Sequence, residues 1–150
     1  MDLIALSQAL GLALSVGVLI GAVVPPVMPA WGVAAGAAPL GAVVALASLN
    51  AEDEAVWPAL PIGILAAGFA AIVIAEVAGG AARRERGAEQ VAAQPAAGVS
   101  AILIGSAALL AALTLFVPPV ALVALAALAW IWGSRRRRAQ AKHEGLRVLR

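Results

Sequence analysis

The chain has 150 residues, of which 63% are hydrophobic and 12% are charged, and its formal net charge is +2. Soluble domains carry about 25% charged residues, and a body this small has too little interior to bury so much apolar surface, which excludes an ordinary water-soluble protein. The sequence has no cysteine, which also excludes disulfides, thiolate metal sites and cysteine nucleophiles. We therefore expect one compact bundle of membrane-spanning helices.

The first uncharged stretch runs from Leu3 to Ala51. It is too long for one crossing, since a membrane span needs about 20 apolar residues. We predict span one at Leu3–Val24 and span two at Trp31–Leu49. Between them lies a Val-Pro-Pro-Val tetrapeptide, Val24–Val27. Proline lacks an N–H group and disfavours helical geometry in the residue before it, so this tetrapeptide predicts a turn.

Span three is predicted at Leu60–Ala78, after an acidic loop at Glu52–Glu54. The glycine pair Gly79-Gly80 follows this span and marks its end. A charged segment that contains Arg83 and Arg84 comes next, and it predicts a loop in water between spans three and four.

A second uncharged stretch, from Gln90 to Ser134, contains another Val-Pro-Pro-Val at Val117–Val120. We predict span four at Val99–Val117 and span five at Pro118–Trp132. A single helix over both spans would measure about 51 Å against a hydrocarbon core of about 30 Å, so a break at the prolines is the better solution. Because span five has 15 residues, a re-entrant segment remains the alternative.

Arginine placement predicts the orientation of the chain. The positive-inside rule puts the loop after span three and the run Arg135–Arg138 in the cytoplasm. Counting back through the spans puts the acidic loop and the N-terminus outside. The four tryptophans fall at the expected interfaces, where indole rings prefer to sit. They are Trp31, Trp57, Trp130 and Trp132.

These signals together predict an all-α, polytopic transmembrane helical bundle. It would have about five spans, arranged as two Pro-Pro hairpins around a central helix, in residues 1–134, followed by a basic cytoplasmic tail in residues 135–150. The abundance of alanine, and of arginine over lysine, indicates a bacterial source and hence a cytoplasmic (inner) membrane. The two turns would lie on opposite faces, which fits either an inverted repeat of the transporter kind or a chance recurrence of four residues.

Glu76 is the ionisable residue within a predicted span. Intramembrane carboxylates often mark proton or cation pathways, so Glu76 with Arg83 and Arg84 forms a candidate intramembrane polar site. Glu76 also lies close to the cytoplasmic end of span three. The alternative is therefore an interfacial carboxylate that pairs with one of these arginines.

The tail begins with a run of four arginines, after Gly133-Ser134, which we expect to end span five. Arg135, Arg136, Arg137 and Arg138 are candidate contacts for anionic lipid headgroups, with an attraction of about 1 kcal/mol per charge near the surface. The tail could also lie on the membrane as a short interfacial helix. No aromatic residue interleaves with these arginines, so we expect no nucleic-acid binding.

Two small-x-x-x-small motifs occur in the first two spans. Gly17 and Gly21 form one, and Gly32 and Gly36 form the other. Such spacing allows helix backbones to approach closely, so it predicts tight packing within the bundle.

The sequence shows no paired carboxylates in a span, no metal-ligand cluster, no phosphate-binding glycine loop and no nucleophile–base set. We therefore expect neither an enzyme nor a cofactor. Two roles remain: transport or permeation, and a structural or accessory subunit of a larger membrane complex. The expected partners are membrane lipids, together with further copies of the chain or other subunits.

From span three onward the chain resembles an uncharacterised bacterial membrane family, domain of unknown function 4126. The family tends to show a glutamate near a span end, a charged linker, a Pro-x-x-Gly and a basic amphipathic end. The matching positions are Glu76, the arginines at 83, 84 and 86, Pro95–Gly98, and Lys142 with Arg147. The chain departs from the family at Val77–Gly80, where the family tends to have Asp-Lys followed by proline. The resemblance implies a polytopic bacterial membrane protein of no established activity.

Overall fold

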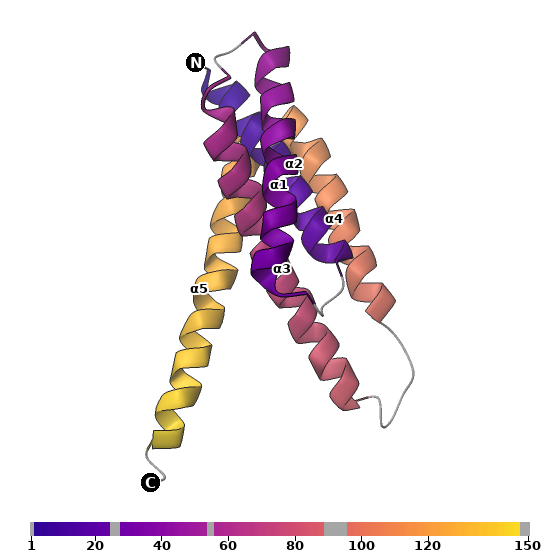
Figure 1. Cartoon of the computed structure of the whole chain (residues 1–150), viewed down its shortest axis with the longest axis vertical. Helices are drawn as coiled ribbons and strands as arrows, with labels where there is room; N and C mark the ends of the chain where they lie inside the picture. The colour runs from indigo at the N-terminus through magenta and orange to yellow at the C-terminus, as the bar shows by residue number, and fades with distance from the viewer. Residues whose placement is uncertain (1, 25–27, 54–55, 89–95, 148–150) are drawn as a thin grey trace.

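The computed structural model describes residues 2–24, 28–53, 56–88 and 96–147, and at 81–88, 96–100, 139 and 141–147 the description is of the backbone. In these ranges the chain forms five α-helices and no strand, so the predicted all-α class is confirmed (Figure 1). The helices are α1 (Leu3–Val23), α2 (Ala30–Ala51), α3 (Ala59–Ala88), α4 (Ala96–Phe116) and α5 (Val120–Arg147).

Three segments are long and apolar enough to cross a membrane, namely Leu3–Val23, Ala30–Ala51 and Ala59–Gly80. They have 21 or 22 residues. At 1.5 Å per residue each measures about 31–33 Å, close to the thickness of a bilayer's hydrocarbon core. Among the described side chains, α4 adds a shorter apolar helix at Ala101–Phe116. Length and composition are thus compatible with a membrane protein.

Successive helices run in alternating directions, and α1 and α3 share the centre of the bundle (Figure 1). Each of these two helices contacts all four of the others. By contrast, α4 and α5 separate from their common turn and lie on opposite sides of the bundle (Figure 1). The sequence predicts span three alone as the central helix, whereas α1 and α3 are both central in the structure.

The second Val-Pro-Pro-Val separates α4 from α5. The Val117 N–H donates to the Leu113 carbonyl at 2.7 Å and closes the last turn of α4. The N–H groups of Ala121 and Leu122 then donate to the carbonyls of Pro118 and Pro119, both at 3.1 Å, and open α5. A single helix through this region is therefore excluded. Of the first tetrapeptide, residues 25–27 lie outside the described residues.

Helices α3 and α5 continue past the ends predicted for spans three and five, while the apolar segment described in α3 is Ala59–Gly80. Gly79-Gly80 lies inside α3, which continues to Ala88, and Gly133-Ser134 lies inside α5, which continues to Arg147. A glycine costs a helix only about 1 kcal/mol relative to alanine. No glycine with a described backbone has the positive φ of a C-terminal cap. Alanine and arginine, both strong helix formers, follow Gly79-Gly80, and four arginines follow Gly133-Ser134, so each helix continues. The described start of the basic tail is therefore a continuation of α5.

Small residues bring α1 and α3 into close contact. A β-carbon at Gly17 would touch the Ala67 carbonyl oxygen and lie 2.8 Å from the Ala70 β-carbon. One at Gly21 would lie 2.9 Å from the Ala71 carbonyl oxygen. The first small-x-x-x-small motif therefore packs as predicted.

The second motif does not make such a contact. A β-carbon at Gly36 would meet nothing within 4 Å, and one at Gly32 would meet only Pro29. Instead, α2 approaches α3 at Gly41 and Gly63, where a β-carbon on Gly63 would contact the Gly41 carbonyl oxygen. The motif alone did not distinguish the glycine that packs from the glycine that faces outward.

Candidate functional site at the basic end of the bundle

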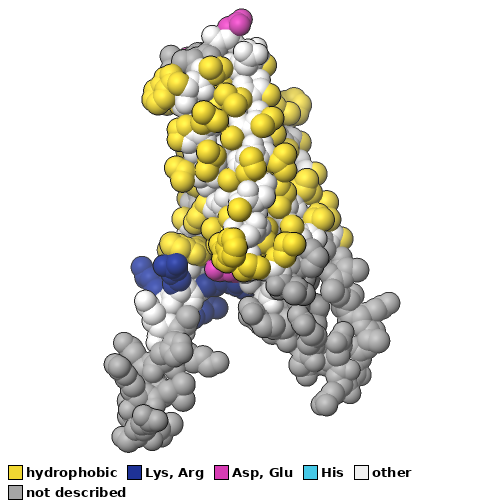
Figure 2. Space-filling model, in the orientation of Figure 1, with side chains coloured by type: hydrophobic (Ala, Val, Ile, Leu, Met, Phe, Trp, Pro, Cys, Tyr) yellow, Lys and Arg dark blue, Asp and Glu magenta, His cyan; other side chains and the backbone are white. Residues whose placement is uncertain are grey.

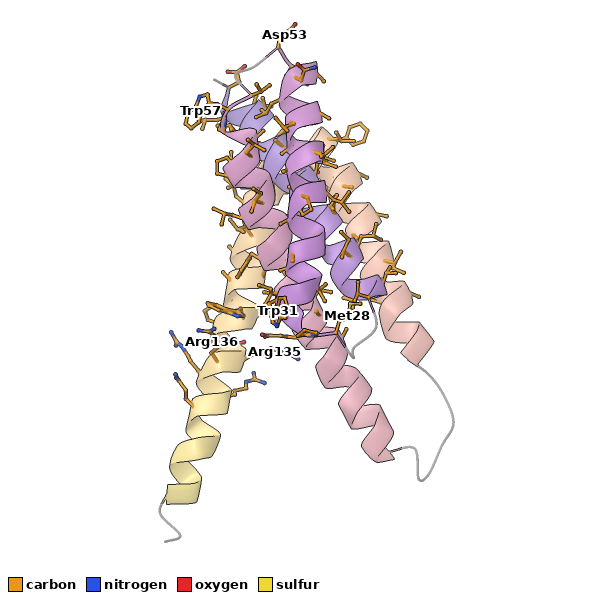
Figure 3. The ribbon with its side chains drawn as sticks, in the orientation of Figure 1. Met28, Trp31, Asp53, Trp57, Arg135 and Arg136 are labelled. Atoms are coloured by element: carbon orange, nitrogen blue, oxygen red, sulfur yellow. The ribbon has the colours of Figure 1, made fainter. Side chains whose placement is uncertain are left out.

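The described surface is apolar along the bundle and charged at its two ends (Figure 2). Acidic side chains mark one end, while basic side chains with an acidic group beside them mark the other. Trp57 lies near the acidic end with Asp53, and Trp31 lies at the level of Arg135 and Arg136 (Figure 3). Both indoles are more than 70% exposed. Exposed indoles at two levels are typical of the two interfaces of a membrane.

Glu76 lies on α3 with its side chain exposed, not in the interior of the bundle. Arg83 and Arg84 follow it on the same helix, and their side chains lie outside the described residues, so the predicted pairing with Glu76 stays a prediction. Glu76 is one helical turn before Gly80, and residues four apart are neighbours on a helix surface. The environment of Gly80 therefore indicates what lies near this carboxylate.

Arg135 reaches this part of α3 from α5. Its Nη2 atom lies 3.3 Å from the position that a β-carbon on Gly80 would occupy. The guanidinium thus sits against α3 one turn beyond Glu76, and Figure 2 shows both acidic and basic side chains at this end of the bundle. The sequence did not predict Arg135 as a neighbour of this part of α3, because Gly80 and Arg135 are far apart in the chain. The available signal was a glycine, Gly80, which leaves room beside α3 for a side chain of another helix.

Arg136 has a different environment, on the aromatic ring that precedes it by one turn. Its guanidinium carbon lies 3.9 Å from the centroid of the Trp132 ring. The Trp132 ring in turn makes an edge-to-face contact with Phe69 of α3, with centroids 5.9 Å apart and planes at 79°. Trp132 also packs against the main apolar core. Arg136 therefore packs on Trp132, whose contact with Phe69 joins α5 to α3.

Arg137 faces away from the bundle. It lines a shallow groove of about 420 Å³. At 100° per residue this face of α5 points opposite to Arg135. Among the described residues the lining of the groove is Ala126, Ala129, Trp130, Gly133, Ser134 and Arg137. The four arginines that the sequence presents as one run thus have separate environments, with Arg138 exposed.

The interior of the described bundle offers little polar chemistry. Ser15 and Thr114 are its buried polar residues. Their hydroxyls donate to carbonyls of their own helices, Ser15 to Leu12 at 2.7 Å and Thr114 to Ala111 at 2.9 Å. Such bonds satisfy the hydroxyl locally and leave no group directed toward a pathway.

Among the described residues no group of three histidine, cysteine or carboxylate side chains could hold a metal ion. No protein-family model matches the sequence, and neither a curated protein nor a solved structure matches it. A function can therefore be inferred only from the residues of this chain.

Proposed function

We propose that this protein is a structural or accessory subunit of a larger membrane complex. The observation that carries the proposal is the distribution of side-chain size: small residues lie between the helices, and large apolar residues lie on the outside of the bundle. The contacts between α1, α2 and α3 consist mainly of alanine and glycine, while large apolar side chains face outward. Examples are Leu65, Leu109, Phe116 and Val123, which are between 62% and 85% exposed.

This distribution supports a packing role more than a transport role. A transport site near the membrane midplane needs polar groups that face a cavity or pathway. The buried hydroxyls of the described interior bond to their own helices. Glu76, the candidate for a proton or cation site, is exposed at the charged end of the bundle.

The proposal includes a membrane orientation. With the arginine-bearing ends in the cytoplasm, the N-terminus and the acidic loop lie outside, and the two Pro-Pro turns lie on opposite faces of a bacterial inner membrane. The hairpin of α1 and α2 and the hairpin of α4 and α5 would then be arranged around α3. Membership of the family of unknown function that the second half of the chain resembles is part of the same proposal.

The accessory role can be tested by native electrophoresis of source membranes. An epitope-tagged chain at its normal expression level should migrate as a discrete assembly, heavier than the purified chain. The purified chain in liposomes should pass no protons above the level of empty liposomes when a potassium diffusion potential is imposed and internal pH is followed with a dye. Migration at the size of the purified chain, or a proton flux that Glu76→Gln abolishes, would refute the accessory role.

A further inference from the structure

The members of the arginine run on α5 differ in their surroundings, and these surroundings decide which of them lines a groove. Arg135 lies against Gly80, and Arg136 covers the Trp132 ring. Arg137 instead lines the outward groove of about 420 Å³, next to Ser134 and beyond Gly133. The groove is therefore apolar along its floor and cationic at one end.

We propose that this groove binds one anionic phospholipid. The phosphate would lie at Arg137, and one acyl chain would lie along the small residues Ala126, Ala129 and Gly133. From Ala126 to Arg137 the helix rises about 16 Å, so the groove extends from the level of the arginines into the apolar part of α5. A phospholipid has the same order, with charge at the surface and hydrocarbon below it.

Charge and position favour a lipid over a protein segment as the occupant. Arg137 and Arg138 are exposed, so the end of the groove is complementary to an anion. The floor faces outward from the bundle, where lipid reaches it without any change in the fold. Trp130, which is 78% exposed, lines the groove about 10 Å along the helix from Arg137, at the depth where the acyl chain would lie. The site requires only that α5 lies in a bilayer, so it does not depend on the accessory role.

Gly133 allows the groove to be filled without disturbing the protein. A β-carbon there would meet nothing within 4 Å. Gly133→Leu should therefore leave the helix packing intact while it occupies the space of the acyl chain. Gly105→Leu is the matched control, because Gly105 on α4 also has open space around it and lies outside this groove.

The experiment measures bound phospholipid by native mass spectrometry, after the protein is released from bilayers of phosphatidylglycerol and phosphatidylethanolamine. We expect phosphatidylglycerol to stay bound to the wild type and to Gly105→Leu. Gly133→Leu should lose it, and Arg137→Gln should bind it at least about tenfold more weakly, as for a lost charge-assisted hydrogen bond. Arg138→Gln should weaken binding about fivefold at most, as for one charge near an anionic surface.

Three results would overturn the proposal. Equal losses in Arg137→Gln and Arg138→Gln would mean that the arginines act only as a diffuse charge. Unchanged binding in Gly133→Leu would mean that the groove holds no acyl chain. Loss of a dimer in Gly133→Leu, with lipid binding unchanged, would assign the groove to a second copy of the chain. Elution of each variant as a single species in detergent controls for misfolding.

Discussion

The guanidinium carbon of Arg136 lies over the Trp132 ring, 3.9 Å from its centroid, and Trp132 also packs against the main apolar core. Phe69 meets the same ring edge-to-face from α3. A cation over an indole contributes about 0.5–1 kcal/mol at an exposed site, and an aromatic pair contributes about 0.5–1.5 kcal/mol. Trp132 thus links the middle of α5 to α3.

We expect Trp132→Leu to lower the free energy of unfolding by about 1–3 kcal/mol, because it removes both aromatic interactions. Trp130→Leu is the control, since Trp130 is 78% exposed and should cost less than about 0.5 kcal/mol. Unfolding in mixed micelles of mild detergent and sodium dodecyl sulfate, followed by circular dichroism, measures both variants. Equal losses would contradict the assignment of Trp132 as the link.

The number and kind of elements could be predicted because they depend on local properties of the chain. Hydropathy and the length of the hydrocarbon core gave the helices α1 and α2 to within a few residues. The Pro118-Pro119 break followed from the length of the apolar stretch together with proline chemistry. Helix ends were less predictable, because Gly79-Gly80 and Gly133-Ser134 end a helix only if the chain takes up a positive φ there. Nothing in the local sequence requires that.

The neighbours in the candidate site could be predicted less well, since they depend on how distant helices pack. Glu76 was singled out for its charge, and its expected partners were the nearest arginines in the sequence. The position of Arg135 against Gly80 results from the contact between α3 and α5. Similarly, a run of four arginines does not reveal that three of its members face different surroundings.

The close contact of α1 with α3 makes Gly17 sensitive to substitution. Gly17→Ala would place a β-carbon 2.8 Å from the Ala70 β-carbon and against a backbone carbonyl, so the helices must move apart. We expect a loss of about 1–3 kcal/mol of unfolding free energy, which is typical of overpacking. Gly36→Ala meets open space and should be neutral or slightly stabilising. The same detergent titration compares them, and an unchanged Gly17→Ala would contradict this packing.

Thr114 tests whether a buried hydroxyl is needed for more than packing. The residue is fully buried, and a β-carbon at Gly11 would contact its methyl group. Since the hydroxyl bonds only to its own helix in the described structure, Thr114→Val should cost less than about 1 kcal/mol. Thr114→Leu should cost about 1–3 kcal/mol, because it overpacks the contact between α1 and α4. A large loss in Thr114→Val would show that the hydroxyl has another partner.

The orientation can be tested directly because the chain contains no cysteine, so a single introduced thiol reports its own side of the membrane. Glu52 is exposed beyond α2, and Arg138 is exposed at the basic end of α5. With the arginines inside, a membrane-impermeant maleimide should label Glu52→Cys in intact spheroplasts, and Arg138→Cys only after the membrane is permeabilised. The opposite pattern would reverse the orientation. Labelling of both thiols in intact spheroplasts would show that the two ends of the apolar belt lie on the same side, which is incompatible with membrane-crossing helices between them.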